Sequence, residues 1–428
     1  MYSRVFFKSS NCVRNLTKYA IAIVLCVCSV SVAMAQDTTG KTYSKEDFIN
    51  VDGSSLQEKL DRAERQFRDS RQGTSFWAAY HFQVRDGISV GPFSGYVYED
   101  GDGIRLYRKD DPNTVAVFLL MDTSGSRATL SRIKTLNLSE PYLFESRPVY
   151  WLGNVDTGQS ISYMQSVMHA NSDNKDLIAN ALRAISIHNS PQVIPMLKEV
   201  ALKDSSFDIQ RSAIRALGRI PAKESLDALD DIFNTVDNTS LKQETIRSYA
   251  ANGDHIAEKR VLDRLTTISK SDKENLDVRV EAIRRIASFR GDAIVDRLFD
   301  IYNSLNDRNV KIGIIQTLSG RGARDDQIMQ RLATIAKKDQ DSSLQVEAVR
   351  RISNVTNSDS PEATINTLIE IYDSNPGDSV KEEVIRALSR SKSRKAIDKL
   401  LSIAQKDDNP RLRQAAIRVL SSKGVSVF

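Results

Sequence analysis

Arginines at one position of a repeated segment are the residues most able to bind a partner. They recur every 32 to 37 residues, and Gln316 takes the place of one of them. A guanidinium group offers a planar fork of donors that can grip a carboxylate or phosphate with two parallel hydrogen bonds. A stripe of such groups would bind an acidic partner. The predicted partner-binding residues are Arg183, Arg215, Arg247, Arg284, Arg350, Arg386 and Arg418.

Local ion pairs are the alternative interpretation of four of these arginines. A glutamate stands three residues before each of the four, at Glu244, Glu281, Glu347 and Glu383. A Glu–Arg pair at this spacing stabilises a helix by about 0.2–0.5 kcal/mol and neutralises part of the stripe. We favour this structural interpretation of the stripe. The better binding candidates are then the arginines that have no such glutamate, Arg183, Arg215 and Arg418.

The other reactive residue types form no recognised catalytic or metal-binding motif. The four histidines do not stand at metal-ligand spacing on a helix, and HExxH does not occur. All three cysteines lie within the first 28 residues. SxxK occurs at Ser131 and at Ser389, but without the companion motifs of a serine acyl enzyme. The sequence therefore predicts a protein that is not an enzyme and holds no cofactor or metal.

Two features of the N-terminal half could bind a ligand but have simpler explanations. The acidic run Glu99–Gly103 lacks the further ligands and the closing glutamate of a calcium loop, so we interpret it as a hairpin turn. Aromatic residues gather around Trp77 and Trp151. Such groups are more often hydrophobic core than a platform for a ligand, so we expect them to be buried.

Aliphatic residues around each arginine predict the elements that carry the stripe. An aliphatic residue, which we call the anchor, stands directly before each arginine. Apolar residues also stand five positions before each anchor and three positions after it, so these positions share one face of a helix. Asp, Asn or Ser stands six residues before most anchors, and we interpret it as the helix N-cap. A second amphipathic segment lies between consecutive anchors. The anchors are Leu182, Ile214, Ile246, Ile283, Ile315, Val349, Ile385 and Ile417.

The repeats resemble HEAT repeats of the short bacterial type. The stretches Val278-Arg279…Ala282-Ile283-Arg284 and Leu412-Arg413…Ala416-Ile417-Arg418 match that family's V-R-x-x-A-x-x-x-L core, and the likeness covers residues 158–422. It implies a mostly α-helical fold, a right-handed α-solenoid of about eight HEAT-like helix pairs, with the arginines on its concave surface. It also implies Asp–Arg pairs six residues apart that tie repeats together, which Asp407 and Arg413 retain.

The chain is predicted to have four parts. Residues 1–35 carry four basic residues, an apolar run and Ala33-Met34-Ala35, the layout of a cleavable signal peptide. Its removal lowers the formal charge from +5 to about +1, which gives no reason to expect nucleic-acid binding. Residues 36–53 are predicted to be a flexible linker. Residues 54–157 are predicted to form a helix and a small antiparallel β-rich domain, and residues 158–428 the solenoid.

The whole chain also resembles exported bacterial proteins in which a small β-rich N-terminal region precedes HEAT repeats. The segment Arg147–Gly153 and the helix pair after it carry this resemblance, which implies no particular activity. We predict a non-catalytic scaffold of the periplasm or cell envelope that binds an unidentified protein or peptide on its concave face. The alternatives are binding of an anionic envelope glycan or lipid, and an accessory subunit of an enzyme. No membrane-spanning segment is expected after signal cleavage.

Overall fold

The computed structural model divides the chain into two compact units, residues Met1–Ser190 and Pro191–Phe428. The predicted signal peptide, residues 1–35, lies outside the residues that the structure describes. The described residues are 42–86, 97–99, 105–107, 115–138, 142–251, 255–289, 291–320, 326–354, 362–374 and 376–426.

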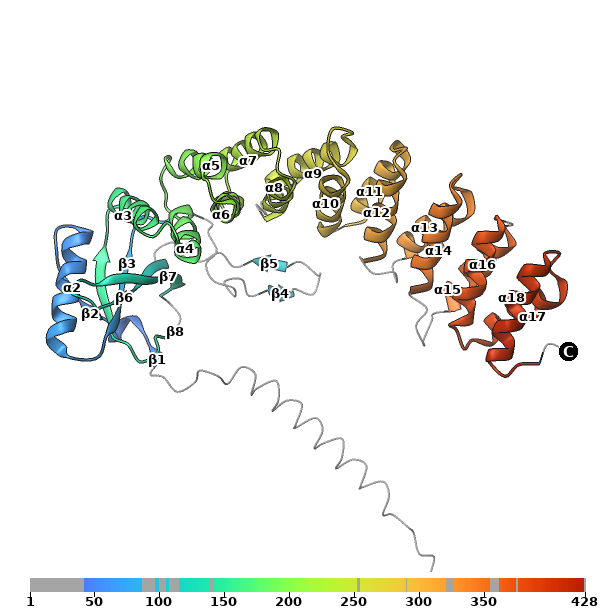
Figure 1. Ribbon diagram of the computed structural model, residues 1–428, viewed down its shortest axis with the longest axis horizontal. Coiled ribbons are helices and arrows are strands. Elements are labelled where there is room, and N and C mark those ends of the chain that lie inside the picture. Colours follow the sequence, from blue (N-terminus) through green and yellow to red (C-terminus); the bar gives the residue numbers. More distant parts are fainter. Residues whose placement is uncertain are drawn as a thin grey trace, which may run out of the picture. The chain divides into compact units, whose positions relative to one another are not determined.

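The second unit is a succession of helix pairs, which confirms the predicted solenoid (Figure 1). The first helices of its pairs are α5 (Val193–Lys203), α7 (Lys223–Thr235), α9 (His255–Lys270), α11 (Asp292–Ser304), α13 (Asp326–Lys338), α15 (Glu362–Asp373) and α17 (Arg394–Lys406). The second helices are α6 (Phe207–Gly218), α8 (Thr239–Ala251), α10 (Leu276–Ser288), α12 (Arg308–Gly320), α14 (Ser342–Ser353), α16 (Asp378–Ser389) and α18 (Pro410–Ser422).

One earlier helix pair belongs to the first unit. It consists of α3 (Thr157–Ala170) and α4 (Lys175–Ser186), so the compact units divide one pair later than the predicted domain boundary at residue 158. With this pair, the described residues contain the eight helix pairs that the repeats predict.

Helices of the same kind lie beside one another along the second unit. Each second helix contacts the next second helix from α6 to α18, and first helices do the same from α9 to α17. We call these the second-helix row and the first-helix row. Seven anchors, from Leu182 to Ile385, are at most 1% exposed, because neighbouring helices cover them. Ile417 on α18 is only half-buried, because no described helix follows it.

The helix N-caps lie two residues earlier than the sequence predicts. Asn275 caps α10 by accepting a hydrogen bond from the backbone N–H of Val278, whereas the predicted cap, Asp277, lies inside the first turn. The correction has a physical reason, since a cap side chain must reach the second or third N–H of the helix. The predicted cap and first-turn proline of the last helix, Asn409 and Pro410, are confirmed. The caps with this geometry are Asn174, Asn238, Asn275, Asp307, Asp341 and Asn409.

The first unit contains a mixed sheet, which corrects the predicted antiparallel one. Its strand order is β2 (Ile49–Asn50), β9 (Val149–Asn154), β3 (Ser75–His81), β6 (Val115–Asp122) and β7 (Thr129–Asn137). Strands β3, β6 and β7 are antiparallel neighbours, as predicted, but β9 runs parallel to both β2 and β3. All five central residues of β3 are buried, so this strand needs a neighbour on each side, and β9 supplies the second.

The short strands β4 (Val97–Glu99) and β5 (Arg105–Tyr107) pair antiparallel, apart from this sheet. Of the turn predicted at Glu99–Gly103, Glu99 ends β4, and the other four residues lie outside the described residues. A further short pair joins β1 (Thr42–Tyr43) to β8 (Tyr142–Leu143).

The predicted flexible linker is ordered over its described part, which is a second correction. Residues 45–47 form a 3-10 helix, β2 pairs with β9, and Val51 is buried. Phe48 explains this order, since its ring packs edge-on against Phe118 and Phe144 at 6.0 Å between ring centroids. Phe48 itself, an aromatic residue in a mostly polar stretch, was the sequence signal for this contact.

Apolar side chains cover both faces of the sheet. On one face, helix α2 (Leu56–Ser70) presents Phe67 to Phe76 and Tyr150. On the other face, Trp77 and its buried neighbours form a second cluster, in agreement with the expected aromatic core. None of the helices in the described ranges combines the length and hydrophobicity that crossing a membrane requires.

Candidate partner-binding site

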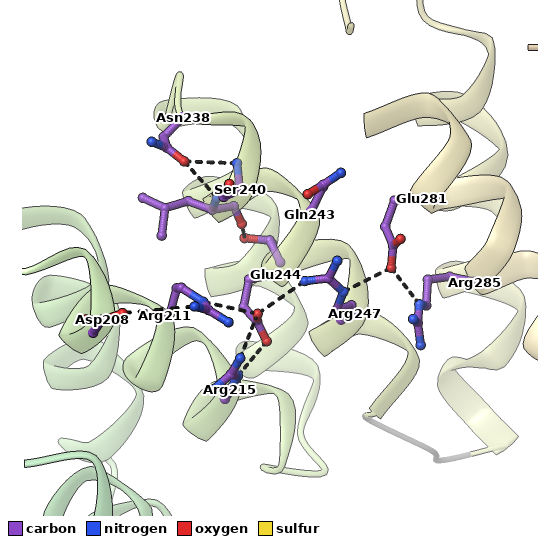
Figure 2. Close-up of polar contacts among 12 residues, drawn as sticks. Asp208, Arg211, Arg215, Asn238, Ser240, Gln243, Glu244, Arg247, Glu281 and Arg285 are labelled. Atoms are coloured by element: carbon purple, nitrogen blue, oxygen red, sulfur yellow. Dashed lines mark hydrogen bonds and ion pairs between the residues drawn. The ribbon is translucent and has the colours of Figure 1, made fainter. Parts of the chain in front are cut away.

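A buried carboxylate joins three arginines from two neighbouring helices. Glu244 on α8 is only 5% exposed, and Arg215 on α6 grips it with Nε–Oε1 and Nη2–Oε2 distances of 2.7 and 3.1 Å. Arg247 on the same helix contributes an Nη1–Oε2 contact of 3.4 Å, and Arg211 lies 3.5 Å away. Figure 2 shows Glu244 between Arg215 and Arg247. The carboxylate therefore links α6 to α8.

The same arrangement continues from α8 to α10. The Nε of Arg247 lies 3.1 Å from Oε1 of Glu281, which is 4% exposed (Figure 2). Glu281 also pairs with two arginines of its own helix, Arg285 at 2.9 Å and Arg284 at 3.7 Å. Arg247 thus reaches Glu244 of its own helix and Glu281 of the next, so side chains alternate in charge across three helices.

A second stretch of alternating charge runs from α12 to α16. Gln316 on α12 donates to Oε1 of Glu347 on α14 at 3.4 Å. Arg350 on α14 lies 3.4 Å from Glu383 on α16, which also accepts a hydrogen bond of 2.8 Å from Arg386. We call the two stretches together the arginine–glutamate ladder. Its members are Arg215, Glu244, Arg247, Glu281 and Arg284, then Gln316, Glu347, Arg350, Glu383 and Arg386.

The ladder is interrupted between α10 and α12. The position that carries glutamate in α8, α10, α14 and α16 is Gly313 in α12. Among the described residues, the ion pair of Arg284 is with Glu281 alone, and the Arg284 side chain is 59% exposed. No carboxylate of α12 meets this arginine, whereas α8, α10, α14 and α16 each provide one to the preceding second helix.

A cavity opens at this interruption. It has a volume of about 420 Å³, and Val280, Arg284, Gly313 and Gln316 are among the residues that line it. An adjoining cavity of about 280 Å³ shares these four residues and extends to Leu276. We call the two cavities together the α10–α12 notch.

The electrostatics of Glu244 explain how a carboxylate remains charged here. Burial alone would raise the pKa of Glu244, but the hydrogen bond and positive charge of Arg215, with Arg211 and Arg247, lower it below the ordinary value. The hydrogen bond to Glu244 in turn raises the pKa of Arg215. Each partner therefore holds the other in its charged form.

The structure changes the assignment of the predicted binding arginines. Arg215 lacks a glutamate on its own helix but pairs with Glu244 of the next, so the inference that it has no acidic partner was wrong. Arg247, Arg284, Arg350 and Arg386 make the predicted local pairs, at 2.8 to 3.8 Å. Arg183 on α4 is partly buried, which lowers its pKa, and Arg418 on α18 is exposed.

Sequence reasoning missed the pairs between helices. The partners are separated by 29 residues for Arg215 and Glu244, 34 for Arg247 and Glu281, and 33 for Arg350 and Glu383. The available signal was that each glutamate stands at the same position of its repeat as the others. That position faces the arginine of the preceding repeat once the helices stack.

The implied Asp–Arg pair between repeats is replaced by a Tyr–Asp contact. Arg413 donates to the backbone carbonyl of Asp407 at 2.7 Å, while the Asp407 carboxylate accepts from the hydroxyl of Tyr372 on α15 at 2.7 Å. Tyr302 on α11 makes the equivalent bond to Asp339 at 2.6 Å. The aspartate thus joins neighbouring repeats through tyrosine.

The first-helix row has ion pairs of its own, and most of their carboxylates are exposed, although Asp230 is 26% exposed. The pairs join α5 to α7, α7 to α9, and so on to α17. The pairs with exposed carboxylates are Lys198–Asp231, Arg260–Asp227, Arg297–Asp263, Arg331–Asp296, Lys337–Glu370, Lys395–Glu362 and Lys399–Asp373. The carboxylate side chains of these pairs are 48% to 75% exposed, so water screens them.

The first unit contains a buried series of hydrogen-bonded side chains that was not predicted. The Tyr80 hydroxyl lies 2.9 Å from Ser160 Oγ, which lies 2.8 Å from Nε2 of His188. Nδ1 of His188 lies 2.9 Å from the carbonyl of Ala184, so we assign the proton to Nδ1. Phe82 stacks on the imidazole at 3.7 Å. Burial lowers the pKa of His188 to about 4, which keeps the ring neutral.

The other candidate reactive residues lie apart from one another. His169 is exposed on α3 and His81 is half-buried on β3. Ser131 of the first SxxK match donates to the carbonyl of Leu120, and Ser389 of the second donates to that of Arg386. Within the described residues, no three His, Cys, Asp or Glu side chains gather closely enough to hold a metal ion.

Comparison with protein families finds HEAT repeats in two segments. The family model described as "HEAT repeats" matches residues 166–250 and 329–421. The matches cover part of the helix pairs described above, whose fold is HEAT-like. The α10–α12 notch lies between the two matched segments. Among curated protein sequences, none matches this chain significantly.

Solved structures with similar helix arrangements differ widely in what they are. Human deoxyhypusine hydroxylase in complex with glycerol is 13% identical, over 55% of this chain and 86% of that chain, with a TM-score of 0.27. Kap121p is 15% identical, with a TM-score of 0.32 over 62% of this chain, which covers only 33% of Kap121p. A chain from a structure of cadherin and beta-catenin interaction is 15% identical over 61% of this chain and 64% of that chain, with a TM-score of 0.25.

Proposed function

We propose that this protein is a non-catalytic scaffold that binds a protein or peptide through its second-helix row. The arginine–glutamate ladder is the observation that carries the proposal. Arg215, Arg350 and Arg386 have side chains 48% to 58% exposed, yet each is tied to a glutamate that is at most 5% exposed. The ladder therefore presents guanidinium groups at the surface in fixed positions.

Fixed arginines suit partner binding for an entropic reason. Ordering a long side chain on binding costs about 0.5–1.5 kcal/mol, and a guanidinium already held by a carboxylate has lost much of that freedom. A guanidinium has five N–H donors. Arg350, for example, approaches Glu383 with Nε and Glu347 with Nη1, so donors remain that can meet a partner.

Catalysis is not part of the proposal, because the group that most resembles a catalytic one is buried. Ser160 and His188 are hydrogen-bonded to each other, but both are 0% exposed. His188 is oriented by a backbone carbonyl and not by a carboxylate. A substrate would have no access to this serine.

The cell envelope is the proposed location. The support is the pattern of residues 1–35, which has the basic start, apolar run and small residues of a signal peptide. An envelope glycan or lipid is the second candidate ligand. It would bind through the same arginines, with affinity that falls steeply as salt rises.

Crosslinked capture from a native envelope extract tests the scaffold proposal. The full chain is compared with two triple variants, each carrying arginine-to-glutamine or lysine-to-glutamine changes. The test variant alters the ladder positions Arg215, Arg350 and Arg386, and the control alters the first-helix positions Arg297, Arg331 and Lys395. We expect one protein partner with the wild type and the control, and its loss with the test variant. Thermal melting checks that both variants are folded.

Two results would contradict the proposal. One is that no protein is captured by the wild-type chain. The other is that the test variant captures the partner as well as the control does, which would move binding away from the second-helix row. Capture of glycan or lipid in place of protein would favour the second candidate.

A further inference from the structure

We infer that the α10–α12 notch binds the carboxylate of an acidic residue in a partner peptide, with an apolar side chain of the same peptide beside it. This inference rests on the proposed scaffold function and names the partner chemistry. The notch is where Arg284, Gly313 and Gln316 line a cavity of about 420 Å³.

The first argument is the repeated chemistry of the ladder. At the steps into α8, α10, α14 and α16, a glutamate at one repeat position meets a side chain of the preceding second helix. At the step into α12 that position is Gly313, and Arg284 faces the cavity with 59% of its side chain exposed. A carboxylate of the ligand would lie beside Arg284, in the place that a glutamate of the next second helix takes at those four steps.

The second argument is space. Gly313 has no side chain to occupy the notch, and Val280 of the neighbouring helix α10 occupies part of the space beside it. A Cβ at Gly313 would lie 2.9 Å from Cγ2 of Val280, closer than side chains normally approach. The cavity volume of about 420 Å³ is many times the roughly 10–15 Å³ that one water molecule needs, so the cavity has room for a carboxylate side chain.

The third argument concerns the charge of the ligand. Glu281 pairs with Arg284 at 3.7 Å, and Asp277 lines the adjoining cavity. Arg285 is held by Glu281 at 2.9 Å on the same helix. The two acids offset the positive charges of Arg284 and Arg285, so a ligand group with one negative charge meets less repulsion here than a phosphate with nearly two.

The fourth argument identifies the apolar neighbour. Leu276, at the start of α10, is 40% exposed and is one of two large hydrophobic residues in the described chain with such exposure. It lines the adjoining cavity together with Ile312. A peptide whose carboxylate meets Arg284 would place its next side chains near this apolar surface and remove it from water.

Selection from a displayed library of random linear peptides tests the inference. The full chain at low ionic strength is the bait, and the affinities of enriched peptides are measured by fluorescence polarisation. We expect enriched peptides to share an Asp or Glu next to an aliphatic or aromatic residue. Changing that acid to its amide should weaken binding about 10-fold or more, as loss of a charged hydrogen bond does.

Two variants of the chain locate the binding. Arg284→Gln removes the guanidinium, and Val280→Ala/Gly313→Glu supplies the carboxylate from within the chain and fills the notch. Arg297→Gln is the matched control, since it removes a guanidinium from the first-helix row, outside the notch. We expect both notch variants to weaken binding about 10-fold or more, and the control to bind as the wild type does. If the double variant does not fold, Arg284→Gln carries the test.

The outcomes separate this inference from the proposed function. Peptides that bind the wild type and the notch variants equally would overturn the notch as the site while leaving the scaffold function standing. Enriched peptides without an acidic residue would overturn the carboxylate chemistry. Failure to enrich any peptide would overturn the notch inference, and the scaffold proposal would then be judged on the crosslinked capture of a whole partner.

Discussion

Each unit of the molecule buries titratable side chains, but the two units do so in opposite ways. In the first unit, burial of His188 beside neutral partners lowers its pKa and keeps the ring neutral, and hydrogen bonds link it through Ser160 to Tyr80. In the second unit, Glu244 is buried against arginines that keep it charged. Burial alone therefore does not decide the charge state of a group. The partner that replaces water decides it.

The two helix rows of the second unit differ in how far the carboxylates of their ion pairs are buried. The ladder glutamates Glu244, Glu281 and Glu383 are at most 5% exposed, whereas the first-helix row pairs similar residues in water. Exposed pairs contribute little, and a buried charge left without its partner costs much more. The three environments thus rank in the size of effect expected when each is disturbed.

The largest expected effect is acid destabilisation of the first unit. The pKa of His188 is about 4 in the folded chain and 6.5 when unfolded, so between these values the unfolded chain binds more protons and stability falls with falling pH. The full loss is about 3 kcal/mol. Both tryptophans of the chain, Trp77 and Trp151, lie in this unit, so urea unfolding followed by tryptophan fluorescence reports on it.

His188→Gln is the control for this titration, because an amide can take part in hydrogen bonds but does not titrate. Its stability should vary less between pH 6.5 and about 4 than that of the wild type. A wild-type profile parallel to that of the variant would show that His188 titrates normally, and the contrast between the two units would be lost.

The next effect is the removal of a ladder carboxylate. Glu244→Ala leaves Arg211, Arg215 and Arg247 without their shared partner, and we expect a loss of about 2 kcal/mol. Hydrogen exchange of the backbone amides in α6 and α8 is the suitable measurement, because repeat arrays can open locally. Protection in α6 and α8 should fall more than in α16 and α18. A uniform or negligible change would contradict a structural role for this carboxylate.

The smallest effect is expected in the first-helix row. Glu370→Ala removes an exposed partner of Lys337, and the expected loss is about 0.5 kcal/mol or less. Added salt should reduce even this difference, because exposed pairs are screened. The same exchange measurement on α13 and α15 checks it. A loss equal to that of Glu244→Ala would show that burial does not separate the two rows.

Much of the fold followed from the sequence because the repeats record it several times. The anchors recur in eight copies, seven of them buried, so their helix face was predictable even where one copy is irregular. The mixed sheet was harder, because β9 joins β3 across a long stretch of chain and its short apolar run does not state its direction. The order of residues 42–51 depends on Phe48, whose aromatic neighbours lie far along the chain.

The candidate site was predicted only in part. The arginines and their local glutamates could be read from one helix at a time, but the ladder depends on the register between helices, as the pair of Arg247 with Glu281 illustrates. Gln316 was recognised as a break in the series. Gly313, three residues earlier, is the residue that opens the notch, and a lone glycine on a helix gave no sign of that.

The interrupted ladder also has a mechanical consequence. A carboxylate shared by two helices resists the sliding of one past the other, so α6 to α10 form one braced block and α12 to α16 form another. Between these blocks the ladder has no shared carboxylate among the described residues, and a polar link from α10 to α12 is the ion pair of Arg279 with Asp307, the N-cap residue of α12, at 2.9 Å. A ligand carboxylate held by Arg284 would add a further polar link between α10 and α12, and would stiffen the solenoid at this step.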